Sequence, residues 1–160
     1  MEKKVILAVR KILIVLLVIW MIVVFFLSNQ NGEESSGLSH KVSLIITFGN
    51  EERASSIEPT IRKVAHMTEY AIGAMLFYGI LMTYQKFSLQ SKIGMTFVFI
   101  VVCSGLDELH QSYIDARSGN FIDVGIDTFG GLLGLGASYL VDGMIRIMDR
   151  EVQKEIDRTR

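Results

Sequence analysis

The chain has 160 residues, half of them hydrophobic, and its mean hydropathy is +0.39. This length suits a single domain over residues 1–160, and the composition indicates an integral membrane protein rather than a soluble one. The formal net charge of −1 gives no basis for a nucleic-acid partner. A single cysteine, Cys103, excludes a disulfide framework and a cysteine-based metal site, so we expect it to pack as a small apolar residue.

Residues 5–27 are predicted to form the first membrane span, because residues 12–27 contain neither a charge nor a glycine. Arg10 and Lys11 mark its inner edge. The basic start also fits a secretory signal peptide, but the apolar run is too long and no small-x-small cleavage site follows it. We therefore predict an uncleaved anchor.

The polar, acidic segment 28–56 contains an apolar stripe at helical spacing, formed by Leu38, Val42, Ile45 and Ile46. Gly49 follows as a helix C-cap, and His40 is predicted to be solvated. The stripe is too short to span a bilayer, so it indicates an interfacial or re-entrant helix. Two roles remain open for it: a connector on the surface, or a lid.

The second span is predicted over residues 60–84, in a helix that starts near Ser55 or Ser56. Ser55 and Glu58 have capping-box spacing, and Pro59 would then lie in the first turn. Four ionisable side chains fall on one face of this helix, at helical spacing: Arg62, His66, Glu69 and Tyr70.

The third and fourth spans are predicted over residues 93–112 and 121–142. Gly130 and Gly134 have G-x-x-x-G spacing, which admits either a closely packed helix or an acyl chain. Residues 143–160 continue the last helix as an amphipathic tail, with an apolar stripe formed by Ile145, Met148, Val152 and Ile156. The predicted fold is thus an all-α bundle of four transmembrane helices.

Four spans place both termini on the same side of the membrane. Most of the basic residues share that side: Lys3, Lys4, Arg10, Lys11, Lys86, Lys92, Arg146, Arg150, Lys154, Arg158 and Arg160. The positive-inside rule makes this side cytoplasmic. We therefore predict a multi-pass protein of the bacterial cell membrane with cytoplasmic termini.

The same alternation gathers ionisable groups from three helices at the outer end of the bundle. These residues are Arg62, Lys63, His66, Glu69, Asp107, Glu108, His110, Gln111, Asp123 and Asp127. Arg62 and Lys63 oppose the positive-inside tendency, so we expect acidic partners near them. The sequence predicts a polar pocket that opens outward.

Three uses of this cluster remain open, and the first is structural: the charges could neutralise one another and tie the helices together. The second is catalysis on a lipid or lipid-linked envelope substrate. General acid–base candidates are His66, Glu69, Asp107, Glu108 and His110. Candidate substrate-binding residues are Arg62, Lys63, Tyr70, Gln111, Arg117, Asp123 and Asp127. Of these, the basic residues Arg62, Lys63 and Arg117 would hold a phosphate.

A divalent metal is a variant of the catalytic hypothesis. Its ligands would come from His66, Glu69, Asp107, Glu108 and His110, although no H-E-x-x-H signature is present. The third use is binding without turnover, of a lipid-linked cell-wall precursor or a glycopeptide antibiotic. Transport is disfavoured because the inner halves of the helices lack ionisable residues.

Two segments, IRKVAHMTEYAIGAMLF and SGLDELHQSYIDARSGNFIDVGIDTFGGLLG, resemble the VanZ-like family of bacterial membrane proteins. The shared pattern is R-K-x-x-H-x-x-E-Y on one helix, then D-E-x-H-Q followed by R, D, D and G. The likeness covers roughly residues 27–136; one difference is Asp115-Ala116, where the family usually has Pro-Gly. The resemblance implies an association with resistance to glycopeptides, teicoplanin in particular, and no settled reaction, substrate or cofactor.

Overall fold

The computed structural model describes residues 2–30, 32–114 and 120–159, and the regular structure in these ranges is helical. The helices are α1 (Glu2–Ser28), α2 (Gly32–Ile46), α3 (Glu51–Met82), α4 (Leu89–Gln111) and α5 (Phe121–Arg158). All except α2 are long and apolar enough to cross a membrane. The predicted all-α fold with four transmembrane helices is confirmed.

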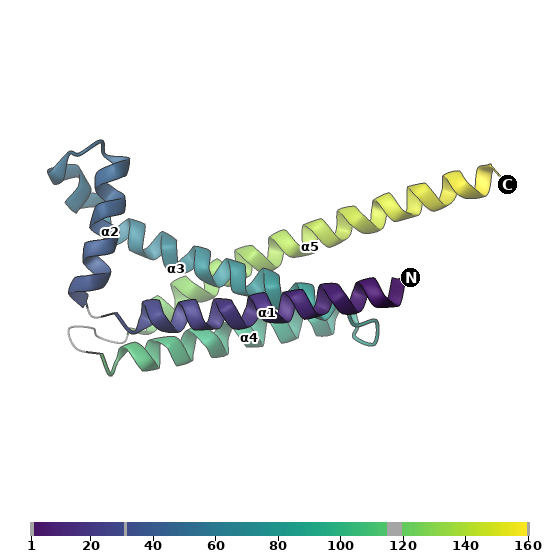
Figure 1. Ribbon diagram of the computed structural model, residues 1–160, viewed down its shortest axis with the longest axis horizontal. Coiled ribbons are helices and arrows are strands. Elements are labelled where there is room, and N and C mark those ends of the chain that lie inside the picture. Colours follow the sequence, from purple (N-terminus) through teal and green to yellow (C-terminus); the bar gives the residue numbers. More distant parts are fainter. Residues whose placement is uncertain (1, 31, 115–119, 160) are drawn as a thin grey trace.

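The two termini lie at one end of the bundle, and α2 lies at the opposite end (Figure 1). Successive long helices therefore run in alternate directions. The last turns of α1 and α4 and the first turns of α5 lie at the α2 end, and α3 enters the bundle from its contact with α2 (Figure 1). This is the end at which the charged segments were expected to converge. Which side of the membrane this end faces stays a prediction.

The start of α3 differs from the sequence-based prediction. Asn50, not Ser55, caps the helix, and its side chain accepts a hydrogen bond of 2.9 Å from the backbone N–H of Arg53. Glu51 and Glu52 then occupy the first turn, where negative charge is favoured by the helix dipole. Pro59 consequently lies inside the helix rather than in its first turn.

The α2 helix packs against the start of α3 instead of lying free. Gly49 ends it as predicted: with φ of +82°, it donates its N–H to the carbonyl of Leu44 at 2.8 Å. His40 is not simply solvated, because its Nε2 lies 3.1 Å from Glu51 and its Nδ1 lies 3.5 Å from Glu58. The histidine thus fastens α2 to α3.

The close approach of α3 and α5 depends on glycine. A Cβ on Gly130 would overlap the backbone of Met67, and a Cβ on Gly134 would overlap the backbone of Ala71. The neighbouring Gly131 faces the side chain of Ile100 on α4 in the same way. The glycine face of α5 therefore receives neighbouring helices and not an acyl chain.

At the end of the bundle that holds the termini, Arg10 of α1 caps the C-terminus of α3. Its guanidinium donates to the hydroxyl and the carbonyl of Thr83, both at 2.8 Å, and lies 3.8 Å from the ring centre of Tyr84. A cation is favoured at this position because the last carbonyls of a helix lack intrahelical partners. Beyond this level α5 continues unbroken to Arg158 (Figure 1).

Candidate functional site

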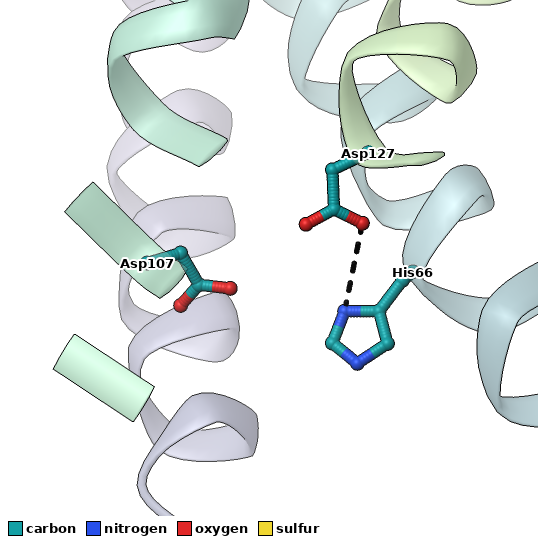
Figure 2. A group of neighbouring side chains, drawn as sticks. All are labelled: His66, Asp107 and Asp127. Atoms are coloured by element: carbon teal, nitrogen blue, oxygen red, sulfur yellow. Dashed lines mark ion pairs between the residues drawn. The ribbon is translucent and has the colours of Figure 1, made fainter. Parts of the chain in front are cut away.

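The centre of the candidate site consists of one side chain from each of three helices: His66 of α3, Asp107 of α4 and Asp127 of α5. Their ligand atoms all lie within 4.8 Å of one another, and Nδ1 of His66 is 3.9 Å from Oδ1 of Asp127. Figure 2 shows both carboxylates turned toward the gap beside the imidazole. Asp127 is 2% exposed and Asp107 is 9% exposed, so the site is buried within the helices.

The glycine contact explains why these groups meet. Asp127 precedes Gly130 by three residues, so the two share a face of α5, and Gly130 sits on the backbone of Met67. His66 directly precedes Met67 on α3. A side chain at position 130 would hold the helices apart and withdraw Asp127 from His66.

Two more polar groups surround the centre. Gln111 lies one turn after Asp107 on α4 and donates its Nε2 to Oδ2 of Asp107 at 2.9 Å. Glu69 lies one turn after His66 on α3, with Oε2 3.8 Å from His66 Nδ1. Gln111 therefore fixes the orientation of the Asp107 carboxylate, while Glu69 brings a third acid to the histidine.

This arrangement concentrates negative charge inside membrane-crossing segments. Two full charges about 4 Å apart repel by roughly 4 kcal/mol even at an effective dielectric constant of about 20. Asp107 and Asp127 place carboxylate oxygens within 4.8 Å of each other, and ionisable groups in such a setting are costly. The site therefore favours whatever brings positive charge to it, a proton or a cation.

Glu108 and His110 lie on α4 beside Asp107, and Glu108 is close enough to Asp127 to interact with it electrostatically. Each also has a partner outside the centre of the site. Glu108 is 7% exposed and accepts a hydrogen bond from the backbone N–H of Asn120, the residue that caps α5. The ring of His110 stacks on Phe25 of α1, with centroids 5.1 Å apart. The structure thus does not pair His110 with His66; it turns His110 toward α1.

Among the expected substrate-binding residues, Arg62 and Lys63 are exposed on α3. Within the described ranges neither side chain makes an ion pair, so the expected acidic partners are not found there. Asp123 is half-buried in the first turn of α5, and Arg117 lies outside the described residues.

Tyr70 borders the cluster through a side-chain hydrogen bond with Asp107, and it also joins α3 to α1 and α4. It is 1% exposed and packs edge-on against Trp20 of α1, with ring centroids 6.0 Å apart. Its hydroxyl is 3.5 Å from the carbonyl of Cys103 on α4. Cys103 packs beside this apolar group, in keeping with the role expected for it.

Sequence reasoning missed three residues that support the site. The indole N–H of Trp20 donates to the backbone carbonyl of Glu69 at 2.8 Å, and Thr128 pairs with Ser104 through hydroxyls 3.3 Å apart. Asn120 caps α5 and binds Glu108. Only Asn120 carried a usable signal, as a capping residue before an apolar run.

Neither a search of curated proteins nor a search of solved structures found a significant match. The family model VanZ/LLP1 matches residues 13–142. This range covers most of the chain, including part of each membrane-crossing segment and every residue of the cluster, so the chain belongs to the VanZ/LLP1 family.

Proposed function

We propose that the buried cluster around His66, Asp107 and Asp127 binds a component of the bacterial cell envelope at the membrane interface. The ligand is the head group of a lipid-linked cell-wall precursor or a glycopeptide antibiotic, and binding modulates susceptibility to teicoplanin-type antibiotics. The observation that supports this proposal is that three membrane-crossing helices converge acidic and basic groups on one buried point. Ion pairs that only hold helices together do not require charged groups from three helices to meet at one buried point.

The surroundings of the cluster fit a ligand that enters from the membrane interface. Arg62 and Lys63 are exposed on α3 one turn before His66, where they can contact a phosphate or another anionic group. The cluster lies at the α2 end of the bundle, which the positive-inside rule assigns to the outer face. Residues 1–160 act in this proposal as a single membrane domain with cytoplasmic termini.

A second candidate is a membrane-embedded hydrolase or transferase acting on the same class of lipid-linked substrate. It is favoured by one geometric observation: Nδ1 of His66 lies 3.8 Å from Glu69 and 3.9 Å from Asp127. An imidazole whose Nδ1 faces a carboxylate has the arrangement of a general base with its orienting acid, and the base would then be Nε2. Turnover of a labelled lipid-linked precursor in vesicles would separate this candidate from simple binding.

The test is a teicoplanin susceptibility assay in a Gram-positive host. It compares the wild type with Asp107→Asn and Asp127→Asn, and membrane protein levels are checked by blot. Asp142→Asn is the matched control, because Asp142 also lies on α5 and is partly buried, but pairs with Arg146 at the opposite end of the bundle. We expect the wild type and the control to protect, and both cluster variants to fail at normal protein levels.

Two results would count against the proposal. If the cluster variants protect as well as the wild type, the charges are structural. If the wild type itself does not change susceptibility, the proposed role in antibiotic response is wrong for this chain.

A further inference from the structure

We propose that His66 Nδ1 and one carboxylate oxygen each from Asp107 and Asp127 bind a single divalent cation (Figure 2). The inference rests on the proposed function, since it names what allows this site to hold an anionic head group. Metal binding itself can be measured on the purified protein without any envelope ligand.

The ligand set comes from three helices and differs from the one that the sequence suggested. The three ligand atoms lie within 4.8 Å of one another. Metal–ligand bonds of about 2.1 Å place neighbouring ligand atoms roughly 3 Å apart, so each side chain has to move inward by about 1 Å. Side-chain torsions allow such a movement without displacing a helix. Glu108 and His110 are held by Asn120 and Phe25 and fall outside the set.

One ligand is already oriented for this role. Gln111 donates to Oδ2 of Asp107, and the Tyr70 side chain is hydrogen-bonded to the same carboxylate, so its orientation is set by two neighbours. Hydrogen bonds of this kind orient carboxylate ligands in metal sites. Glu69 lies 3.8 Å from the same nitrogen, Nδ1 of His66, so it is placed to supply a further ligand.

The charge of the two aspartates also favours a cation in this site. A phosphate would be repelled by Asp107 and Asp127, which are both buried and close together. A divalent cation offsets both carboxylates, and three protein ligands leave coordination positions open for phosphate oxygens. One imidazole nitrogen with two carboxylate oxygens suits Mn²⁺ or Zn²⁺ better than Ca²⁺. The cation would thus convert an acidic site into one that accepts an anion.

Mn²⁺ is the probe of choice, because its electron paramagnetic resonance signal separates free from bound ion. The full chain is purified in detergent, stripped with chelator and titrated with Mn²⁺, alone and in competition with Zn²⁺. We expect one bound ion per chain in the wild type and in Asp142→Asn. Binding should weaken at least tenfold in Asp107→Asn and Asp127→Asn.

Thermal unfolding of the same samples shows whether each variant is folded. Saturating Mn²⁺ should raise the melting temperature of the wild type but not that of the Asp127→Asn variant. The proposal is overturned if the folded wild type binds no ion, or if both aspartate variants bind as tightly as the wild type.

The two proposals fail in different ways. If the wild type binds no Mn²⁺ or Zn²⁺ but the cluster variants lose teicoplanin protection, the metal inference is wrong and the functional site stands. If the ion binds through the aspartates but the same variants protect normally, the metal inference stands and the proposed function fails.

Discussion

At the scale of single residues, the site depends as much on side chains that are missing as on those that are present. Gly130 and Gly134 let α5 touch the backbone of α3, and this contact brings Asp127 within reach of His66. Gly73 has the same relation to Trp20, whose indole would overlap a Cβ at that position. These glycines are needed for close approach and not for an unusual backbone conformation.

The glycine contact gives a prediction with an internal control. Gly134→Ala should destabilise the protein by about 1 to 3 kcal/mol, because the new methyl group meets the backbone of Ala71, which cannot rotate away. Gly136→Ala, two residues further along α5, has no neighbouring atom within 4 Å of its Cβ and should leave stability unchanged or slightly raised. Thermal unfolding in detergent measures both. Equal melting temperatures for the two variants would contradict this packing.

Sequence reasoning placed the right residues at the right end of the bundle but could not pair them. Alternation of the spans is enough to put Asp107, His110 and Asp127 at a common depth. It does not fix the rotation of each helix about its axis, which decides that Asp107 faces His66 while His110 stacks on Phe25. That rotation is set by packing against residues far away in the chain.

At the scale of helices, α2 is held in place by a histidine between two acids. His40 contacts Glu51 and Glu58, which lie two turns apart on α3, while Ser39 and Ser43 on α2 are buried. α2 lies at the end of the bundle opposite the termini and packs against α3 (Figure 1). Of the two roles left open by the sequence, a lid would require this contact to break.

His40→Ala should loosen α2 without unfolding the bundle. Partly exposed ion pairs contribute about 0.2 to 1 kcal/mol each, so losing both should accelerate hydrogen exchange in residues 35–46 by roughly two- to thirtyfold. Lys41→Ala removes an exposed charge from the same helix and serves as the control. Unchanged exchange in the His40→Ala variant would show that the histidine does not secure α2.

The start of α5 was predicted correctly at residue 121, whereas α4 begins at Leu89, four residues before the predicted span. Asn120 precedes α5, and Ser88 precedes α4 and accepts from the N–H of Ser91 at 3.1 Å. The start of α3 was misplaced because Ser55 and Glu58 offer a plausible capping box inside the true helix. Asn50 is the cap instead of Ser55, because Gly49, with its positive φ, turns the chain directly before Asn50.

At the scale of the whole molecule, the arrangement of the helices separates two chemically different ends. One end carries the buried acidic cluster, and the other carries basic side chains such as Arg10, which binds the last carbonyls of α3. The positive-inside rule then fixes the expected orientation, with the termini in the cytoplasm.

Cysteine labelling tests that orientation. In a Cys103→Ser background, Lys41→Cys on α2 should react with a membrane-impermeant maleimide on intact cells. Gln153→Cys, exposed on the tail of α5, should react only after lysis. The reverse pattern would place the acidic cluster on the cytoplasmic side and exclude an envelope ligand.

The unbroken course of α5 has a mechanical consequence. The helix carries Asp127 near one end, lies beside α3 and α4 as far as Ile147, near Tyr78 and Leu89, and ends at Arg158 beyond the start of α1 (Figure 1). About 11 residues follow Ile147, a length of roughly 16 Å, so a tilt of about 10° in this tail would carry Arg158 some 3 Å. A movement of Asp127 in the buried cluster would reach this tail through a single continuous helix.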